Sequence, residues 1–141
     1  MHLLPYNRAL MLENPRKILC VMSDLFFSVK INDAAKKLGM TVEFVKDKAV
    51  ALERANLKPP LIILDLNCDS ADPLGLLAAF KHDPETRDIT TIGFVSHVQT
   101  ELKQKAQENG CDVVVARSAF AQNLPAILER YAATAQVPEA D

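Results

Sequence analysis

Residues 61–66, LIILDL, are the stretch of this chain that decides its fold. A short, continuous apolar run of this kind is typical of a strand buried on both faces of a parallel sheet. One acid, Asp65, interrupts the run close to its end. A carboxylate at that position needs a polar partner or water, because burying a charge alone is very costly. Asp65 is therefore the first candidate for a functional residue.

Similar apolar runs lie on both sides of this stretch, separated by segments with helical periodicity. The predicted strands are residues 17–23, 41–45, 61–66, 91–96 and 112–116, and the predicted helices are 24–38, 47–57, 74–80, 97–109 and 125–133. Residues 117–123 are predicted to be a connection, with Asn123 capping the last helix. This alternation predicts an α/β fold: one doubly wound, five-stranded parallel sheet of order 2-1-3-4-5 in a three-layer α/β/α arrangement.

Length and composition predict one domain with a core of its own. The chain has 141 residues, of which 49% are hydrophobic and 24% are charged. We expect an N-terminal arm over residues 1–16, a folded domain over 17–131 and a C-terminal tail over 132–141, with no room for an output domain. The net charge of −2 and the absence of a basic run argue against nucleic acid or a membrane surface as partner.

Cysteine and glycine usage restricts the class further. The three cysteines are far apart and form no CxxC pair, which favours a reducing compartment. No signal peptide and no apolar run of about 18 residues can be found, so a cytoplasmic location is expected. The four glycines form no phosphate-cradling loop, which argues against a nucleotide cofactor.

Polar residues follow the predicted strands at the edge where such folds place their sites. They are Ser23, Asp24, Asp65, Asn67, Ser96, His97 and Arg117. Polar residues also occur at strand ends simply because these ends face water. Two chemical alternatives are His97 as a phosphoryl carrier or base, and Cys68 as a nucleophile that uses His97 as its base.

Two motifs resemble the receiver domain (CheY-like) of two-component response regulators. LIILDLN, residues 61–67, places Asp65 at the phospho-accepting aspartate, and GCDVVVARSAF, residues 110–120, is similar to the family's fifth strand and its flanks. The resemblance covers residues 17–131. It implies a flavodoxin/receiver-like fold, a role in two-component (phosphorelay) signal transduction, no enzymatic activity of its own, and protein partners, with a homodimer as one possibility.

The implied phosphorylation pocket departs from the family pattern. The acidic pair that holds magnesium in receivers falls on Met22 and Ser23, and only the next residue, Asp24, is acidic. A thioether is a poor ligand for a hard cation. Ser96 matches the family's hydroxyl residue, while Arg117 stands where the family has lysine. The resemblance therefore implies a degenerate, stand-alone pseudo-receiver with no cofactor, which acts through protein–protein interaction without efficient magnesium-dependent phosphorylation.

Two alternatives and two structural expectations remain open. Asp65 can be a working phosphoacceptor with Mg²⁺ held weakly by Asp24 and Asp65, or the strand edge can hold a small-molecule site or a flavodoxin-like enzyme. We expect Arg117 to form an ion pair with Asp65, because a guanidinium matches a carboxylate. Of Phe26 and Phe27, about 100° apart on one helix, one is expected to be exposed near a partner surface.

Overall fold

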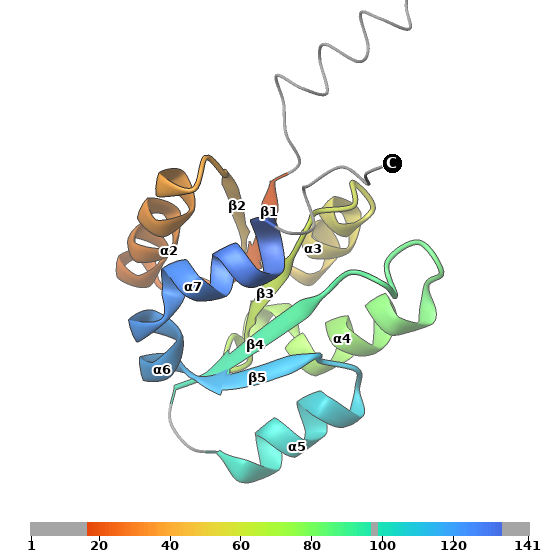
Figure 1. Cartoon of the computed structure of the whole chain (residues 1–141). Helices are drawn as coiled ribbons and strands as arrows, with labels where there is room; N and C mark the ends of the chain where they lie inside the picture. The colour runs from red at the N-terminus through yellow and green to blue at the C-terminus, as the bar shows by residue number, and fades with distance from the viewer. Residues whose placement is uncertain (1–16, 97–98, 134–141) are drawn as a thin grey trace, which may run out of the picture.

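Five parallel strands form a single sheet in the order β2-β1-β3-β4-β5, as the sequence predicts. The computed structural model describes residues 17–96 and 99–133, so the expected arm over 1–16, His97 and residues 134–141 of the expected tail lie outside the described residues. The strands are β1 (Ile18–Val21), β2 (Val42–Val45), β3 (Ile62–Asp65), β4 (Thr91–Val95) and β5 (Val113–Ala116) (Figure 1).

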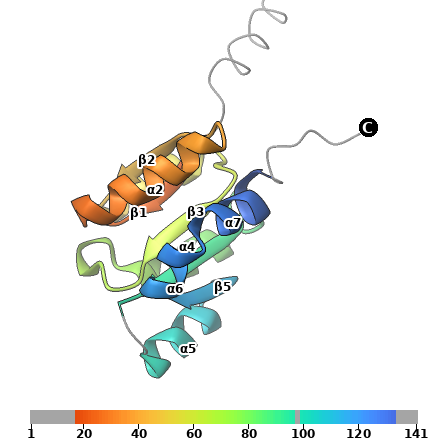
Figure 2. The same cartoon turned by 60° about the vertical axis from the view of Figure 1, so that its left-hand side comes forward.

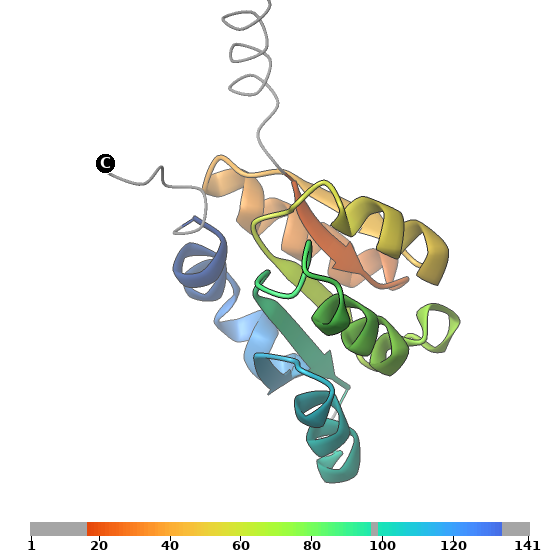
Figure 3. The same cartoon turned by 90° about the vertical axis from the view of Figure 1, so that its right-hand side faces the viewer.

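Helices cover both faces of the sheet (Figures 2 and 3). One face carries α2 (Leu25–Lys37), α6 (Arg117–Gln122) and α7 (Leu124–Leu128), and α7 continues into a π-helical turn, η2 (Glu129–Ala133). The other face carries α3 (Lys48–Ala55), the 3₁₀ turn η1 (Asp69–Ala71), α4 (Pro73–His82) and α5 (Thr100–Glu108). The three-layer α/β/α arrangement is confirmed.

The two faces pack with different side chains. On the α2 face three rings meet: the centroids of Phe94 and Phe120 lie 5.3 Å apart, and that of Phe27 lies 5.2 Å from Phe94. The other face holds one buried ring, that of Phe80, and is otherwise packed with aliphatic and small residues, among which Ala51 and Ala55 bring α3 close to the sheet. Edge-to-face and stacked aromatic contacts add to the burial of apolar area. The α2 face, which holds these rings, lies next to the polar carboxyl edge of the sheet that is described below.

The expected connection 117–123 is wrong, because residues Arg117–Gln122 form the helix α6. Phe120 points from this helix into the hydrophobic core and is fully buried. Leu124 and Leu128 continue the same buried stripe into α7. Asn123 stands at the N-cap position of α7 as expected, but its side chain donates to the carbonyl of Ala119 and makes no capping hydrogen bond. One short helix with a single buried position gave no recognisable periodicity in the sequence.

Strand register brings the carboxyl ends of β1, β3, β4 and β5 to one edge. Val21 pairs with Leu64, Asp65 with Phe94, and Val95 with Ala116. The residues that follow these positions therefore meet at the same end of the sheet.

Gly93 lies within β4, where the side chain of Leu66 occupies the space that a larger residue would need. A Cβ built on this glycine would lie 2.9 Å from Leu66 Cδ1. Leu66 follows Asp65 directly, so this close packing fixes the end of β3 against β4.

Candidate functional site

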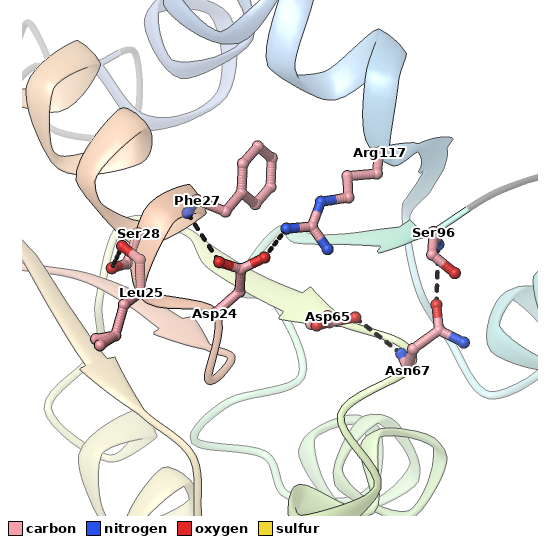
Figure 4. Close-up of polar contacts among 8 residues, drawn as sticks. All are labelled: Asp24, Leu25, Phe27, Ser28, Asp65, Asn67, Ser96 and Arg117. Atoms are coloured by element: carbon pink, nitrogen blue, oxygen red, sulfur yellow. Dashed lines mark hydrogen bonds and ion pairs between the residues drawn. The ribbon is translucent and has the colours of Figure 1, made fainter.

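Asp24 and Arg117 form an ion pair across the pocket at the carboxyl edge (Figure 4). Asp24 is the N-cap of α2, and its Oδ1 accepts the backbone N–H of Phe27 at 3.1 Å. Its other oxygen, Oδ2, accepts from Nη2 of Arg117. Both oxygens are therefore occupied, and the N–H of Phe27 and then the Arg117 side chain lower the pKa of Asp24 from its ordinary value.

The Arg117 guanidinium is held over the aromatic core. Its Cζ lies 4.5 Å from the ring centroid of Phe27 and 6.0 Å from that of Phe94. A guanidinium over a ring face gains a cation–π attraction of about 0.5–1 kcal/mol. The position of Arg117 is thus fixed by a carboxylate at its tip and by rings along one side.

The expected pairing of Arg117 with Asp65 is wrong, since the carboxylate bound to Arg117 is that of Asp24. Asp65 ends β3 and is half-buried, and burial raises its pKa. The N–H of Asn67, which donates to Asp65 Oδ1 at 2.9 Å, and the charge of Arg117 oppose this rise in pKa without cancelling it. Asp65 lies within the electrostatic range of Arg117 but has no ion pair in the described part of the chain.

Asn67 connects three elements at this edge. Its backbone N–H serves Asp65, its Oδ1 accepts the backbone N–H of Ser96 at 2.9 Å, and its Nδ2 donates to Gln99 Oε1 at 3.0 Å. The end of β3 is therefore linked to the end of β4 and to the residue before α5. The sequence predicted Asn67 to be a pocket residue, and the structure shows how it is anchored.

The donors present do not fit a magnesium ion. Met22 is buried, and its thioether would be a poor ligand for a hard cation in any case. A cation at Asp24 would have to compete with the N–H of Phe27 on one oxygen and with the Arg117 guanidinium on the other, whereas Asp65 accepts one backbone N–H, on Oδ1. In residues 17–96 and 99–133, no three histidine, cysteine or acidic side chains are grouped as metal ligands would be.

The sequence also predicted roles for two serines, a cysteine and a histidine near this edge. Ser23 is exposed at the pocket mouth, and Ser96 is exposed at the end of β4. Cys68 is buried and its Sγ lies 3.5 Å from Ser70 Oγ, while His97, its proposed base, lies outside the described residues. The proposed roles of these residues stay predictions.

Sequence reasoning missed the contribution of Phe27 to the pocket. It places Asp24 through its backbone N–H and supports Arg117 through its ring. The available signal was the spacing: Asp24 precedes Phe27 by three residues at the start of an apolar helix, which is the spacing of an N-cap and the N–H that it accepts.

The larger cavity at this edge lies beside β2, away from Asp65. Its volume is about 500 Å³, and residues from the start of α2, from β2 and from the start of α3 line it. Within it, Glu43 accepts from Arg54 Nε at 2.7 Å, so these two charges already have partners.

No described helix is both long and apolar enough to span a bilayer.

Comparison with solved structures places this fold among known ones, whereas no family model and no curated protein matches the chain. The phosphorylated cyanobacterial phytochrome response regulator RcpA is 24% identical with a TM-score of 0.74, over 88% of this chain and 99% of that one. A response regulator from Hahella chejuensis is 18% identical with a TM-score of 0.77, over 87% and 99%. The response regulator domain of Thermotoga maritima CheB is 22% identical with a TM-score of 0.68, over 88% and 98%. The chain therefore has the fold of the receiver domains of response regulators.

Proposed function

We propose that this protein is a receiver-like signalling module whose state is set by binding a protein partner and not by efficient magnesium-dependent phosphorylation. The observation that carries the proposal is the ion pair of Asp24 with Arg117. The resemblance implies a magnesium site at this edge, and Asp24 is the carboxylate that would have to supply it. In this chain that carboxylate is already bound to a guanidinium and to the start of α2.

Arginine suits this role better than lysine would. Its guanidinium is always charged, stacks on aromatic rings and holds carboxylates through planar N–H groups. A divalent cation would have to displace Arg117 from Asp24 and then find further oxygen ligands, for which Met22 offers none. Phosphoryl transfer depends on neutralising charge at the transferring group, so Asp65 without a bound cation is a poor acceptor.

Partner binding is a route by which such a module can signal without phosphorylation. The receiver fold of the solved response regulators supports a role in signal transduction, and the described surface carries exposed apolar side chains beside the pocket. The alternative of a phospho-accepting regulator that uses Asp65 stands as the contrary outcome of the test. The reading as an enzyme or small-molecule binder stays a prediction of the sequence.

The test measures whether beryllofluoride, an acyl-phosphate mimic, binds at Asp65 with Mg²⁺. In amide NMR spectra we expect no magnesium-dependent shifts around Asp65 in the native protein. A Ser23→Asp/Arg117→Lys variant adds a carboxylate and frees Asp24, and it should gain them. A magnesium-dependent shift in the native protein that is lost in Asp65→Asn would overturn the proposal.

A further inference from the structure

A second hollow lies on the other side of Arg117, between α2 and α6. It has a volume of about 380 Å³, and its lining includes Phe26, Lys30, Arg117 and Ser118. Its polar side chains come from three places: Lys30 from α2, Arg117 and Ser118 from the first turn of α6, and Ser96 from the end of β4. We call this hollow the α2–α6 groove.

The α2–α6 groove offers hydrogen-bond donors that the rest of the described chain does not use. Lys30 is exposed and forms no hydrogen bond or ion pair with any residue in 17–96 or 99–133. Arg117 commits Nη2 to Asp24, whereas a guanidinium has five N–H donors in a planar fork. The hydroxyl of Ser118 likewise has no partner among the described residues. Two cations and a hydroxyl therefore face one small space, which favours an acidic ligand.

Exposed apolar side chains continue from the groove along α2. Phe26 is 89% exposed, Leu25 78% and Val29 58%, and they make up three of the four large apolar side chains exposed in the described chain. Phe27, their neighbour, is buried, so the expectation that one of the two phenylalanines is exposed is confirmed. A large apolar cluster left open to water beside charged groups is typical of a contact surface for another protein.

We propose that the α2–α6 groove binds a segment of a protein partner in which a carboxylate side chain stands next to a large apolar one. The carboxylate bonds to Lys30 and to the free N–H groups of Arg117, and the apolar side chain packs on Phe26. This inference rests on the proposed function, because it names the surface through which the module would meet its partner.

The charges around the groove favour a carboxylate over a phosphate group. Asp24 lies directly beside the guanidinium, and Asp65 is close enough to feel its charge. A dianionic phosphate would face repulsion from both carboxylates, whereas a single carboxylate carries half that charge. The exposed ring of Phe26 also offers apolar surface that a free phosphate cannot use.

The test titrates the full chain with the capped peptide acetyl-Asp-Phe-Glu-Leu-amide and follows amide NMR shifts, in buffer without magnesium or beryllofluoride. We expect saturable shifts at Phe26, Lys30 and Ser118. Lys30→Gln and Phe26→Ala should each weaken binding about tenfold, which corresponds to one charged or one aromatic contact. Lys37→Gln, a matched charge removal in the last turn of α2 and outside the groove lining, should bind as the native protein does.

Several outcomes would overturn the inference. These are equal binding of the neutral peptide acetyl-Asn-Phe-Gln-Leu-amide, tighter binding of inorganic phosphate at the same residues, shifts confined to another face, or no shifts at millimolar peptide. A dimer in sedimentation that Phe26→Ala dissociates would assign the apolar residues to a second copy of the chain. Because no magnesium is present, failure here is distinct from failure of the proposed function, which the beryllofluoride experiment decides separately.

Discussion

The ends of β1 and β3 each present one carboxylate to the same pocket, and the structure treats the two in opposite ways. Asp24, after β1, has a hydrogen-bond donor on each oxygen and a lowered pKa. Asp65, at the end of β3, receives one backbone N–H, is half-buried, and has a raised pKa. The surroundings of Asp24 therefore favour its charged form, whereas the burial of Asp65 disfavours its charged form.

The difference between the two carboxylates shows what a fixed arginine does in a pocket that holds two acidic side chains. A cation between the two carboxylates would stabilise both of them. Arg117 supplies a permanent positive charge but binds only Asp24, because the ring of Phe27 and the cap of α2 fix where the guanidinium and that carboxylate meet. The charge of Arg117 acts on Asp65 from a longer distance and offsets only part of the rise in its pKa that burial causes.

The largest expected effect is the loss of stability in Asp24→Ala. The variant removes the cap of α2 and leaves Arg117 without its carboxylate, so the free energy of unfolding should fall by about 2 kcal/mol in urea titrations. Asp47 is the matched control, because it caps α3 in the same way through the N–H of Val50 and has no ion pair with any described residue. Asp47→Ala should fall by about 1 kcal/mol. An equal loss in the two variants would mean that the ion pair adds nothing to stability.

Asn67→Ala should have an intermediate effect on stability. It tests whether the end of β3, which carries Asp65, is held independently of the start of α2, where Asp24 lies. The substitution removes the side-chain bonds to Ser96 and Gln99 but keeps the backbone N–H that serves Asp65. We expect the free energy of unfolding to fall by about 1 kcal/mol, and amide exchange to quicken at the ends of β3 and β4. Faster exchange at the start of α2 instead would contradict the division between the two carboxylates.

The smallest effect, and the one of opposite sign, is expected in Asp65→Asn. The pKa of Asp65 is raised above its ordinary value of 3.8, so between these two values the folded protein holds a proton that the unfolded chain has lost. Stability therefore falls as pH rises through this range, and removing the carboxylate should raise the melting temperature at pH 7 by a few degrees. The advantage over the native protein should vanish as pH falls below 3.8.

Asp24 gives the opposite slope. Its pKa is lowered, so its contribution is present above the ordinary value and is lost as pH falls through the lowered one. Melting curves of the native protein, Asp65→Asn and Asp24→Asn across pH 3–7 compare the two directly. A destabilised Asp65→Asn at pH 7 would show that Asp65 is a stabilising charge and would remove the contrast. Asp33→Asn, on the outer face of α2, serves as a control for charge removal alone.

The fold was predictable because its signals are local and repeated. The run LIILDL predicts a doubly buried strand, and the helices predicted over 24–38 and 47–57 are found at Leu25–Lys37 and Lys48–Ala55. The exception is α6, whose single turn and a half gives no period to recognise and whose continuation carries Pro125 near its start. Only packing against β4 and β5 reveals that Phe120 belongs to a helix.

The site was predictable as a set of residues but not as a set of bonds. Strand order brings Asp24, Asp65 and Arg117 to one edge, which the sequence shows. The choice that Arg117 makes between two carboxylates depends on helix geometry, because the cap turns Asp24 toward α6, and on a ring that lies under the guanidinium. Neither the cap nor the ring contact can be recognised from the residue types at the strand ends, so the sequence pattern predicted the wrong partner for Arg117.

The ion pair of Asp24 and Arg117 also has a consequence for the order of folding. Its two residues are 93 positions apart, so it joins the start of the second element of the folded body to the helix that follows the last strand. Contacts of such long sequence separation require most of the chain to be ordered before they form. Interactions absent from the folding transition state act mainly on the rate of unfolding. The ion pair at the carboxyl edge is therefore expected to form late in folding, and to lengthen the lifetime of the folded state more than it speeds its formation.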